Sequence, residues 1–152
     1  MKKRLLTILL IFICLLTVAC GKKKEEEEEG IKTLTCVAEL DDQKMESTVV
    51  VDTRTGEVSK ASIKMSVPKS FYASFNYTDA QLIEALCNNE GGYFDNCNAA
   101  IDGATINSSF DYVPSNYQKE LEKEYNTEKI DKSILEQMKT KSEENGSKCT
   151  IS

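Results

Sequence analysis

The chain has 152 residues, enough for one domain with little room for a second. With 25 acidic and 19 basic residues its net charge is −6, which argues against a general nucleic-acid-binding protein, because phosphate contacts need clustered Lys and Arg. The sequence contains no His, which excludes Ser-His-Asp and Cys-His catalysis, histidine-containing zinc sites and histidine pH switches.

The N-terminal segment has the pattern of an export signal. Residues 2–4 are basic and residues 5–19 form a continuous apolar run. That run is shorter than the roughly 20 apolar residues of a membrane span but has the length of a signal peptide. Small or apolar residues at 17–19 then precede Cys20. We predict a signal peptide over residues 1–19; the alternative is an uncleaved signal anchor with an incidental Cys.

Residues 1–21 resemble the lipobox signal of bacterial lipoproteins, although Thr17 stands where Leu is commonest. The resemblance implies cleavage before Cys20, attachment of a lipid such as palmitate to the Cys20 thiol, and acylation of the new amino group. Two or more acyl chains anchor a protein stably, whereas one binds reversibly. The expected location is therefore the extracytoplasmic face of the cell membrane. Loss of the three basic residues at 2–4 would change the net charge from −6 to −9.

A low-complexity charged stretch follows Cys20. Residues 22–24 are Lys and residues 25–29 are Glu, and Gly30 follows them. Adjacent like charges repel and bury nothing, so we predict a flexible tether over residues 20–30 that reaches about 33 Å when extended. Its function would be spacing, with cation binding by the glutamates as the alternative.

The first part of the predicted domain, residues 31–152, alternates with a period of two. Residues 33–40, 45–52 and 58–67 show this pattern, which predicts three strands in an antiparallel meander. Gly56 suits the second turn, where a positive φ is needed, and Pro68 ends the third strand.

A capped helix is predicted in the middle of the domain. Residues 69–77 contain four aromatic residues. Such residues usually belong to a core or a lid, and the alternative is a stacking platform for sugars or bases. The pattern does not distinguish a short helical turn from an extended segment. Thr78 and Gln81 form a capping box, which predicts a helix over 79–89 that stops at Gly91-Gly92.

The last part of the chain combines one or two strands with two helices. Residues 93–103 are expected to form a loop or a short helical turn, and residues 104–113 a strand. A second capping box, Ser115 to Gln118, predicts the next helix. Apolar residues then predict a C-terminal helix, and residues 147–152 an edge strand. The apolar residues of the two helices are Tyr117, Leu121 and Tyr125, and Ile130, Ile134, Leu135 and Met138.

This order predicts the α+β class, a mostly antiparallel sheet of a three-stranded meander plus one or two further strands, with helices packed on one face. In size, hairpin-first order and lipobox, residues 30–144 resemble small uncharacterised bacterial lipoproteins of the YehR-like kind. That resemblance implies no catalytic residues.

Four cysteines remain in the domain: Cys36, Cys87, Cys97 and Cys149. An even number in a small exported domain indicates disulfides, with three possible pairings. We favour Cys87–Cys97, which clamps the end of the capped helix, and Cys36–Cys149, which ties the first strand to the C-terminal tail. A zinc site or a thioredoxin-like centre would need C-x-x-C pairs, which the sequence lacks.

Several residues with side-chain oxygens could bind a metal ion or act as catalytic carboxylates. Residues 95–98 and 102–103, Asp-Asn-Cys-Asn and Asp-Gly, superficially suggest calcium, but their spacing fails the EF-hand pattern and is better explained by turns. The acids that could supply a catalytic carboxylate pair have no recognisable spacing and are treated as surface acids. These acids are Glu84, Glu90, Asp95, Asp102 and Asp111.

Two functional classes remain open. The first, which we favour, is a non-enzymatic lipid-anchored module that binds a protein, an envelope polymer or a small ligand. The second is a small envelope hydrolase that uses carboxylates. We predict no catalytic residue, no metal and no cofactor. A concave pocket with two acids of raised pKa would favour the hydrolase, and a shallow surface with exposed aromatic residues would favour binding.

Overall fold

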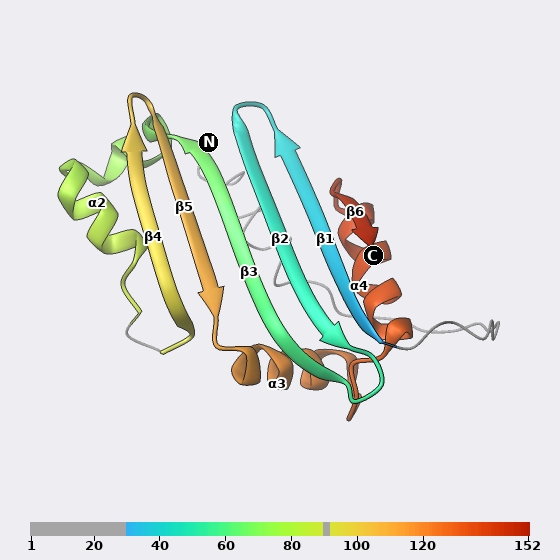
Figure 1. Cartoon of the computed structure of the whole chain (residues 1–152). Helices are drawn as coiled ribbons and strands as arrows, with labels where there is room; N and C mark the ends of the chain where they lie inside the picture. Colours follow the sequence, from blue (N-terminus) through green and yellow to red (C-terminus); the bar gives the residue numbers. More distant parts are fainter. Residues whose placement is uncertain (1–29, 90–91) are drawn as a thin grey trace.

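A computed structural model describes residues 30–89 and 92–152, so the predicted signal peptide, Cys20 and all of the tether before Gly30 lie outside the described residues. Within these ranges the chain forms a six-stranded antiparallel sheet of order β4-β5-β3-β2-β1-β6 and four helical segments (Figure 1). The strands are β1 (Ile31–Leu40), β2 (Gln43–Asp52), β3 (Glu57–Pro68), β4 (Phe94–Asp102), β5 (Thr105–Tyr112) and β6 (Lys148–Ile151). The helical segments are η1 (Lys69–Phe75), α2 (Asp79–Leu86), α3 (Pro114–Tyr125) and α4 (Lys132–Glu144). The α+β class is confirmed, and the sheet has one strand more than the largest number predicted.

The β1–β2–β3 meander is confirmed, with both partners of β2 antiparallel to it. Its second turn has Gly56 at φ +82°, against the chain at Lys129 and Ile130. Beside it, the Arg54 guanidinium forms an ion pair with Asp52 at 2.7 Å. The hydrogen bonds from Arg54 lower the pKa of Asp52 to about 2, so this carboxylate stays ionised at neutral and mildly acidic pH.

The predicted loop over residues 93–103 is wrong, because these residues form β4. The Asp and Asn residues there are typical of turns, but Cys97, Ala99 and Ile101 occupy every second position. These three residues lie opposite core-side residues of β5. Pairing along the length of β5 supplies the backbone hydrogen bonds that outweigh the weak strand propensity of Asn and Asp. Gly103 at φ +58° then allows a tight turn between the two strands.

Helix α2 begins as predicted and ends early. Thr78 and Gln81 form both hydrogen bonds of the capping box. The helix stops at Leu86 rather than at residue 89, and Asn89 belongs to the loop that follows the helix. Its Oδ1 accepts from the backbone N–H groups of Tyr93 and Phe94 and guides the chain into β4.

The predicted capping box at Ser115 is wrong. Helix α3 begins two residues earlier than predicted, at Pro114, and its N-cap is Val113 instead of Ser115 and makes no side-chain hydrogen bond. Proline at the first helical position has its φ preset and needs no N–H partner. The Oε1 of Gln118, the expected partner of Ser115, instead accepts from the backbone N–H of Val58 at 3.0 Å.

The C-terminal part follows the predicted pattern. Helix α4 is capped by the side chain of Asp131, which accepts from the N–H of Ile134 at 3.1 Å. Ile134, Leu135 and Met138 are buried as predicted. Ile130 is completely buried just before the helix begins, and β6 pairs with β1 as the predicted edge strand.

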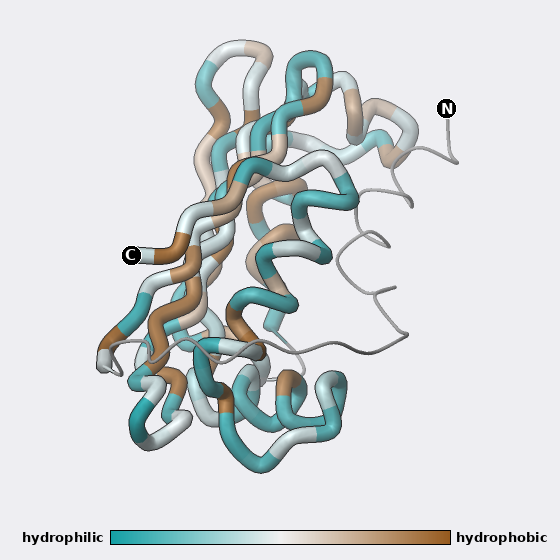
Figure 2. The backbone as a smooth tube through the Cα atoms, turned by 90° about the vertical axis from the view of Figure 1, so that its right-hand side faces the viewer, coloured by the Kyte–Doolittle hydropathy of each residue, from teal (hydrophilic) through white to brown (hydrophobic). Residues whose placement is uncertain are grey.

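The hydrophobic core contains every second side chain along the central strands, which we call the core-side residues, together with side chains of α3 and α4. Leu34, Val49 and Ala61 lie opposite one another on successive strands. They pack in one cluster with Leu121 of α3 and Leu135 of α4. Figure 2 shows hydrophobic and hydrophilic stretches interspersed along the strands and the helices. No helix within the described ranges is long and apolar enough to cross a membrane.

Two disulfides connect the four cysteines in the pairing that we favoured. Cys36 of β1 is bonded to Cys149 of β6, 113 residues away, and both are buried. Cys87, directly after α2, is bonded to Cys97 of β4. Each bond therefore ties an edge strand to another part of the domain.

Candidate functional site

The side chains that alternate with the core set form a polar face on the sheet. On β2, β3, β5 and β4 most side chains of this face are hydroxyl, amide or charged groups. We define the polar face as Lys44, Glu46, Thr48, Ser62, Lys64, Ser66, Asn107, Ser109, Asp111, Asn96, Asn98 and Ala100. Its members lie directly opposite one another in rows that cross the strands, so the pairing of the strands fixes their spacing.

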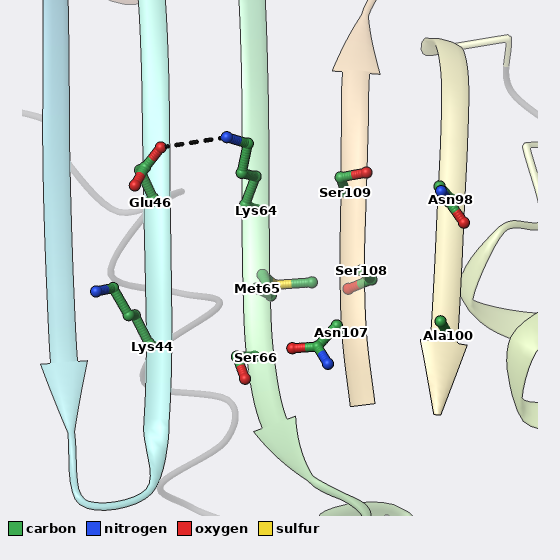
Figure 3. Close-up of a pocket in the computed structure, with 10 residues that line it drawn as sticks. All are labelled: Lys44, Glu46, Lys64, Met65, Ser66, Asn98, Ala100, Asn107, Ser108 and Ser109. Atoms are coloured by element: carbon green, nitrogen blue, oxygen red, sulfur yellow. Dashed lines mark ion pairs between the residues drawn. The ribbon is translucent and has the colours of Figure 1, made fainter. Parts of the chain in front are cut away.

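A shallow hollow of about 410 Å³ lies at this face (Figure 3). Eight of the ten residues that line it belong to the polar face. The polar hollow, as we name it, is lined by Lys44, Glu46, Lys64, Met65, Ser66, Asn98, Ala100, Asn107, Ser108 and Ser109. Met65 and Ser108 belong to the core-side set of their strands.

The polar hollow stands on paired strands rather than on loops. One row crosses it from Glu46 through Lys64 and Ser109 to Asn98, each residue directly opposite the next. Strands β2, β3 and β5 are each hydrogen-bonded on both sides. The side chains are consequently held on a backbone that loses little further freedom when a ligand binds.

Two ion pairs define the electrostatics of this region. The Lys64 Nζ lies 3.6 Å from a carboxylate oxygen of Glu46 within the hollow. The Lys44 Nζ lies 3.2 Å from Glu39 on β1, which is outside the hollow. The two lysine side chains are 69% and 55% exposed, so both pairs are solvated and weak. An incoming charged ligand can therefore displace them at low cost.

The acids singled out in the sequence do not meet in this hollow. Glu84 lies on α2, Asp95 and Asp102 on β4 and Asp111 on β5, whereas Glu90 lies outside the described residues. Among the described residues that line the hollow, Glu46 is the one carboxylate, so they supply no carboxylate pair. Carboxylate-based hydrolysis needs two such groups across the scissile bond. The hydrolase alternative thus gains no support from this site.

The oxygen-rich positions considered for calcium also lie in β4 rather than in a loop. Asp95, Asn96 and Asn98 belong to the strand, and Asp102 ends it. Asn96, Asn98 and Asp102 share one face of the strand, but an extended strand rises about 3.3 Å per residue, so they are spread along it instead of converging on one ion. Over residues 30–89 and 92–152, no group of three or more Cys, Asp or Glu residues could hold a metal ion.

The four aromatic residues of the undecided segment lie in and just after the 3₁₀ helix η1. Their rings form a continuous series, ending in Phe75 and Tyr77, which stack at 5.8 Å between centroids. Phe75 is 53% exposed and Tyr77 47%, and Tyr93 is also exposed. None of these residues lines the polar hollow.

A tyrosine cluster formed by Tyr112 of β5 and by Tyr117 and Tyr125 of α3 packs beside the core and lies outside the polar hollow. The rings of Tyr112 and Tyr117 lie 5.2 Å apart and pack beside the core. Burial raises the pKa of Tyr117 far above its ordinary value, so its hydroxyl stays protonated. Lys141 lies over the Tyr125 ring and pairs with Glu124 at 2.9 Å, which fixes α3 against α4.

Gly30, where the predicted tether meets the domain, is fastened to Thr53. The Thr53 Oγ1 accepts from the Gly30 N–H and donates to the Gly30 carbonyl, both at 2.9 Å, and the Thr53 N–H donates to the same carbonyl at 2.8 Å. The Thr53 side chain is buried. The chain therefore enters β1 at a fixed point on the turn between β2 and β3.

The residues of the polar hollow are not recognisable as a site from the sequence alone. Lys44, Lys64 and Ser109 show no motif, and their only signal is the two-residue alternation within their own strands. The pairing of β3 with β5, 37 or more residues apart along the chain, brings them together and cannot be read from that alternation. Comparisons with protein-family models, with curated proteins and with solved structures find no match for this chain.

Proposed function

We propose that this protein is a non-enzymatic, lipid-anchored binding module on the extracytoplasmic face of a membrane, and that its polar face contacts a polar ligand. The observation that carries the proposal is the polar hollow across β2, β3, β5 and β4. Hydroxyls, amides and weakly paired charges there stand on a rigid sheet, the arrangement that hydrogen bonding to a ligand requires.

We further propose that the polar face is open to solvent and that the helices pack only against the opposite face of the sheet. Helices α3 and α4 contribute Leu121 and Leu135 to the core beside Leu34 of β1. Helix α2 is joined to β4 through Cys97, which lies opposite the core-side Phe110. Each of these contacts involves the apolar set of the sheet, which supports an unobstructed polar face.

Anchoring through Cys20 is supported by the sequence pattern and is compatible with the fold. Two disulfides fit a protein of an oxidising extracytoplasmic compartment. The fastening of Gly30 by Thr53 gives the predicted tether a defined attachment point at the start of β1. The ten residues from 21 to 30 would span up to about 33 Å, enough to hold the domain clear of the lipid headgroups.

Replacement of Cys20 by Ser should release the protein from the membrane, because no thiol remains for the lipid. We expect the wild-type protein to sediment with membranes and to enter the detergent phase on phase separation. The Cys20→Ser protein should appear in the soluble exported fraction or retain its signal. Cys14→Ser is the matched control and should leave membrane association unchanged. Detergent-phase partitioning of Cys20→Ser equal to that of wild type, after signal cleavage, would rule out the lipid anchor.

Replacement of Ser109 by Trp should block ligand binding by filling the centre of the polar hollow. The position is half-buried on the polar face, so the larger ring covers neighbouring hydroxyls and amides without entering the core. The measurement is co-sedimentation of purified envelope fragments with vesicles carrying the full lipidated chain. We expect roughly tenfold weaker retention of the fragments. Ser133→Trp, on the exposed surface of α4, is the control; equal retention by both variants would exclude the polar face.

A further inference from the structure

Two lysines lie at the polar hollow of this acidic protein, and each is weakly paired with one glutamate. The whole chain has six more acidic than basic residues, yet the hollow is lined by Lys44, Lys64 and the single acid Glu46. Lys44 lies opposite Ser66, and Lys64 lies two residues before Ser66 on the same strand, opposite Glu46. The lysines are thus diagonal neighbours, about 7–8 Å apart at their first side-chain carbons. This spacing lets both ammonium groups approach one ligand chain.

The remaining side chains of the hollow suit hydroxyl groups. Asn98 and Asn107 offer amide donors and acceptors, and Ser66 and Ser109 offer hydroxyls that can do either. The lining residues include no aromatic ring, so stacking on a sugar or base face is not available there. The hollow is shallow and crosses four strands, which favours an extended chain that continues beyond it over a small enclosed molecule.

The charge chemistry favours phosphate. A lysine ammonium is a compact point charge that binds phosphate oxygens, and the lining residues include no arginine fork, the group that adds planar bidentate geometry to the recognition of carboxylates or phosphates. On this basis we propose that the polar hollow binds an extended polyhydroxylated chain that carries phosphate groups, such as a polyol phosphate of the cell envelope. This inference rests on the proposed function, since it names the ligand of the same polar face.

Binding of phosphate would involve an exchange of ion pairs. In the free protein Glu46 already occupies Lys64 at 3.6 Å, and Glu39 occupies Lys44 at 3.2 Å. A phosphate group would take the place of Glu46 at Lys64 and would be repelled by the displaced carboxylate. Removing the charge of Glu46 should therefore strengthen binding, whereas removing the lysine charges should weaken it.

The test uses the full lipidated chain in neutral phosphatidylcholine vesicles and three fluorescently labelled polymers. These are poly(glycerol phosphate), polygalacturonate as a carboxylate polymer, and dextran as a neutral one. Co-sedimentation should show poly(glycerol phosphate) bound at least about tenfold more tightly than either of the others, with an affinity that falls as salt rises. The double variant Lys44→Gln/Lys64→Gln should lose at least about tenfold of that affinity. Glu46→Gln should gain roughly threefold by freeing Lys64.

The matched control is Lys119→Gln/Lys123→Gln, which removes the same charge from two exposed positions on α3 and should leave binding unchanged. Equal binding of dextran, tighter binding of polygalacturonate, or an unchanged affinity in the Lys44→Gln/Lys64→Gln variant would overturn the phosphate assignment. If Ser109→Trp still blocks whichever polymer binds, the polar face remains the binding surface and only its ligand class is wrong. If none of the three polymers binds while envelope fragments are retained, the phosphate proposal fails and the proposed function stands.

Discussion

Removing the disulfide between Cys36 and Cys149, by the Cys36→Ala/Cys149→Ala double replacement, should lower the free energy of unfolding by about 5 kcal/mol. The bond closes a segment with a sequence separation of 113, so its loss restores a large conformational freedom to the unfolded chain. It also fastens β6, a strand of four residues that pairs with β1 at the edge of the sheet. A loss of this size is a large fraction of the stability of a small domain.

The control for this prediction is the Cys87→Ala/Cys97→Ala double replacement. That bond closes a separation of only 10, and its loss should lower the free energy of unfolding by a little under 3 kcal/mol. Urea unfolding of each variant, followed by far-ultraviolet circular dichroism, measures both losses. If removal of the short link proves as destabilising as removal of the long one, loop closure does not control the stability of this domain.

Local patterns predicted the parts of the fold that depend on near neighbours in the sequence. The meander follows from alternation and short turns, and the start of α2 follows from Thr78 and Gln81, whose hydrogen bonds span three residues. The Cys36–Cys149 pair is present because the two sequence ends of the domain meet in β1 and β6, and the Cys87–Cys97 pair joins positions only 10 apart in the sequence. The hydrogen bonds or disulfide bonds that stabilise these features join residues that are close in the sequence, or join two elements that were each predicted from their own residues.

The parts that were missed depend on contacts between distant segments. Strand β4 contains Asp95, Asn96 and Asn98, which favour turns by themselves, and only its pairing with β5 makes it a strand. Gln118 was expected to cap its own helix, but its side chain bonds to Val58, 60 residues away. The polar hollow was missed for the same reason, because it exists only where β3 and β5 lie side by side. Residue type within a strand shows which side chains are polar, but not which strands are neighbours.

Replacement of Gly56 by Ala should destabilise the domain by about 2–5 kcal/mol, the largest loss that we expect from any single methyl group. Gly56 has φ +82°, which an L-residue adopts at a cost of about 1–2 kcal/mol. An added Cβ would also lie 2.5 Å from the Lys129 Cγ and 3.0 Å from the backbone nitrogen of Ile130. Ile130 is completely buried, so its backbone cannot retreat without disturbing the core.

Gly103→Ala separates the two causes of this loss. Gly103 also has a positive φ, +58°, but a Cβ there would meet no atom within 4 Å, so its replacement should cost only about 1–2 kcal/mol. The double replacement Gly56→Ala/Lys129→Ala should recover part of the stability of Gly56→Ala, because it removes the flexible Lys129 side chain and leaves the contact with Ile130. Thermal and urea unfolding measure the three variants. Equal losses for Gly56→Ala and Gly103→Ala would mean that the backbone conformation alone, and not the close approach of Ile130, requires glycine in the turn between β2 and β3.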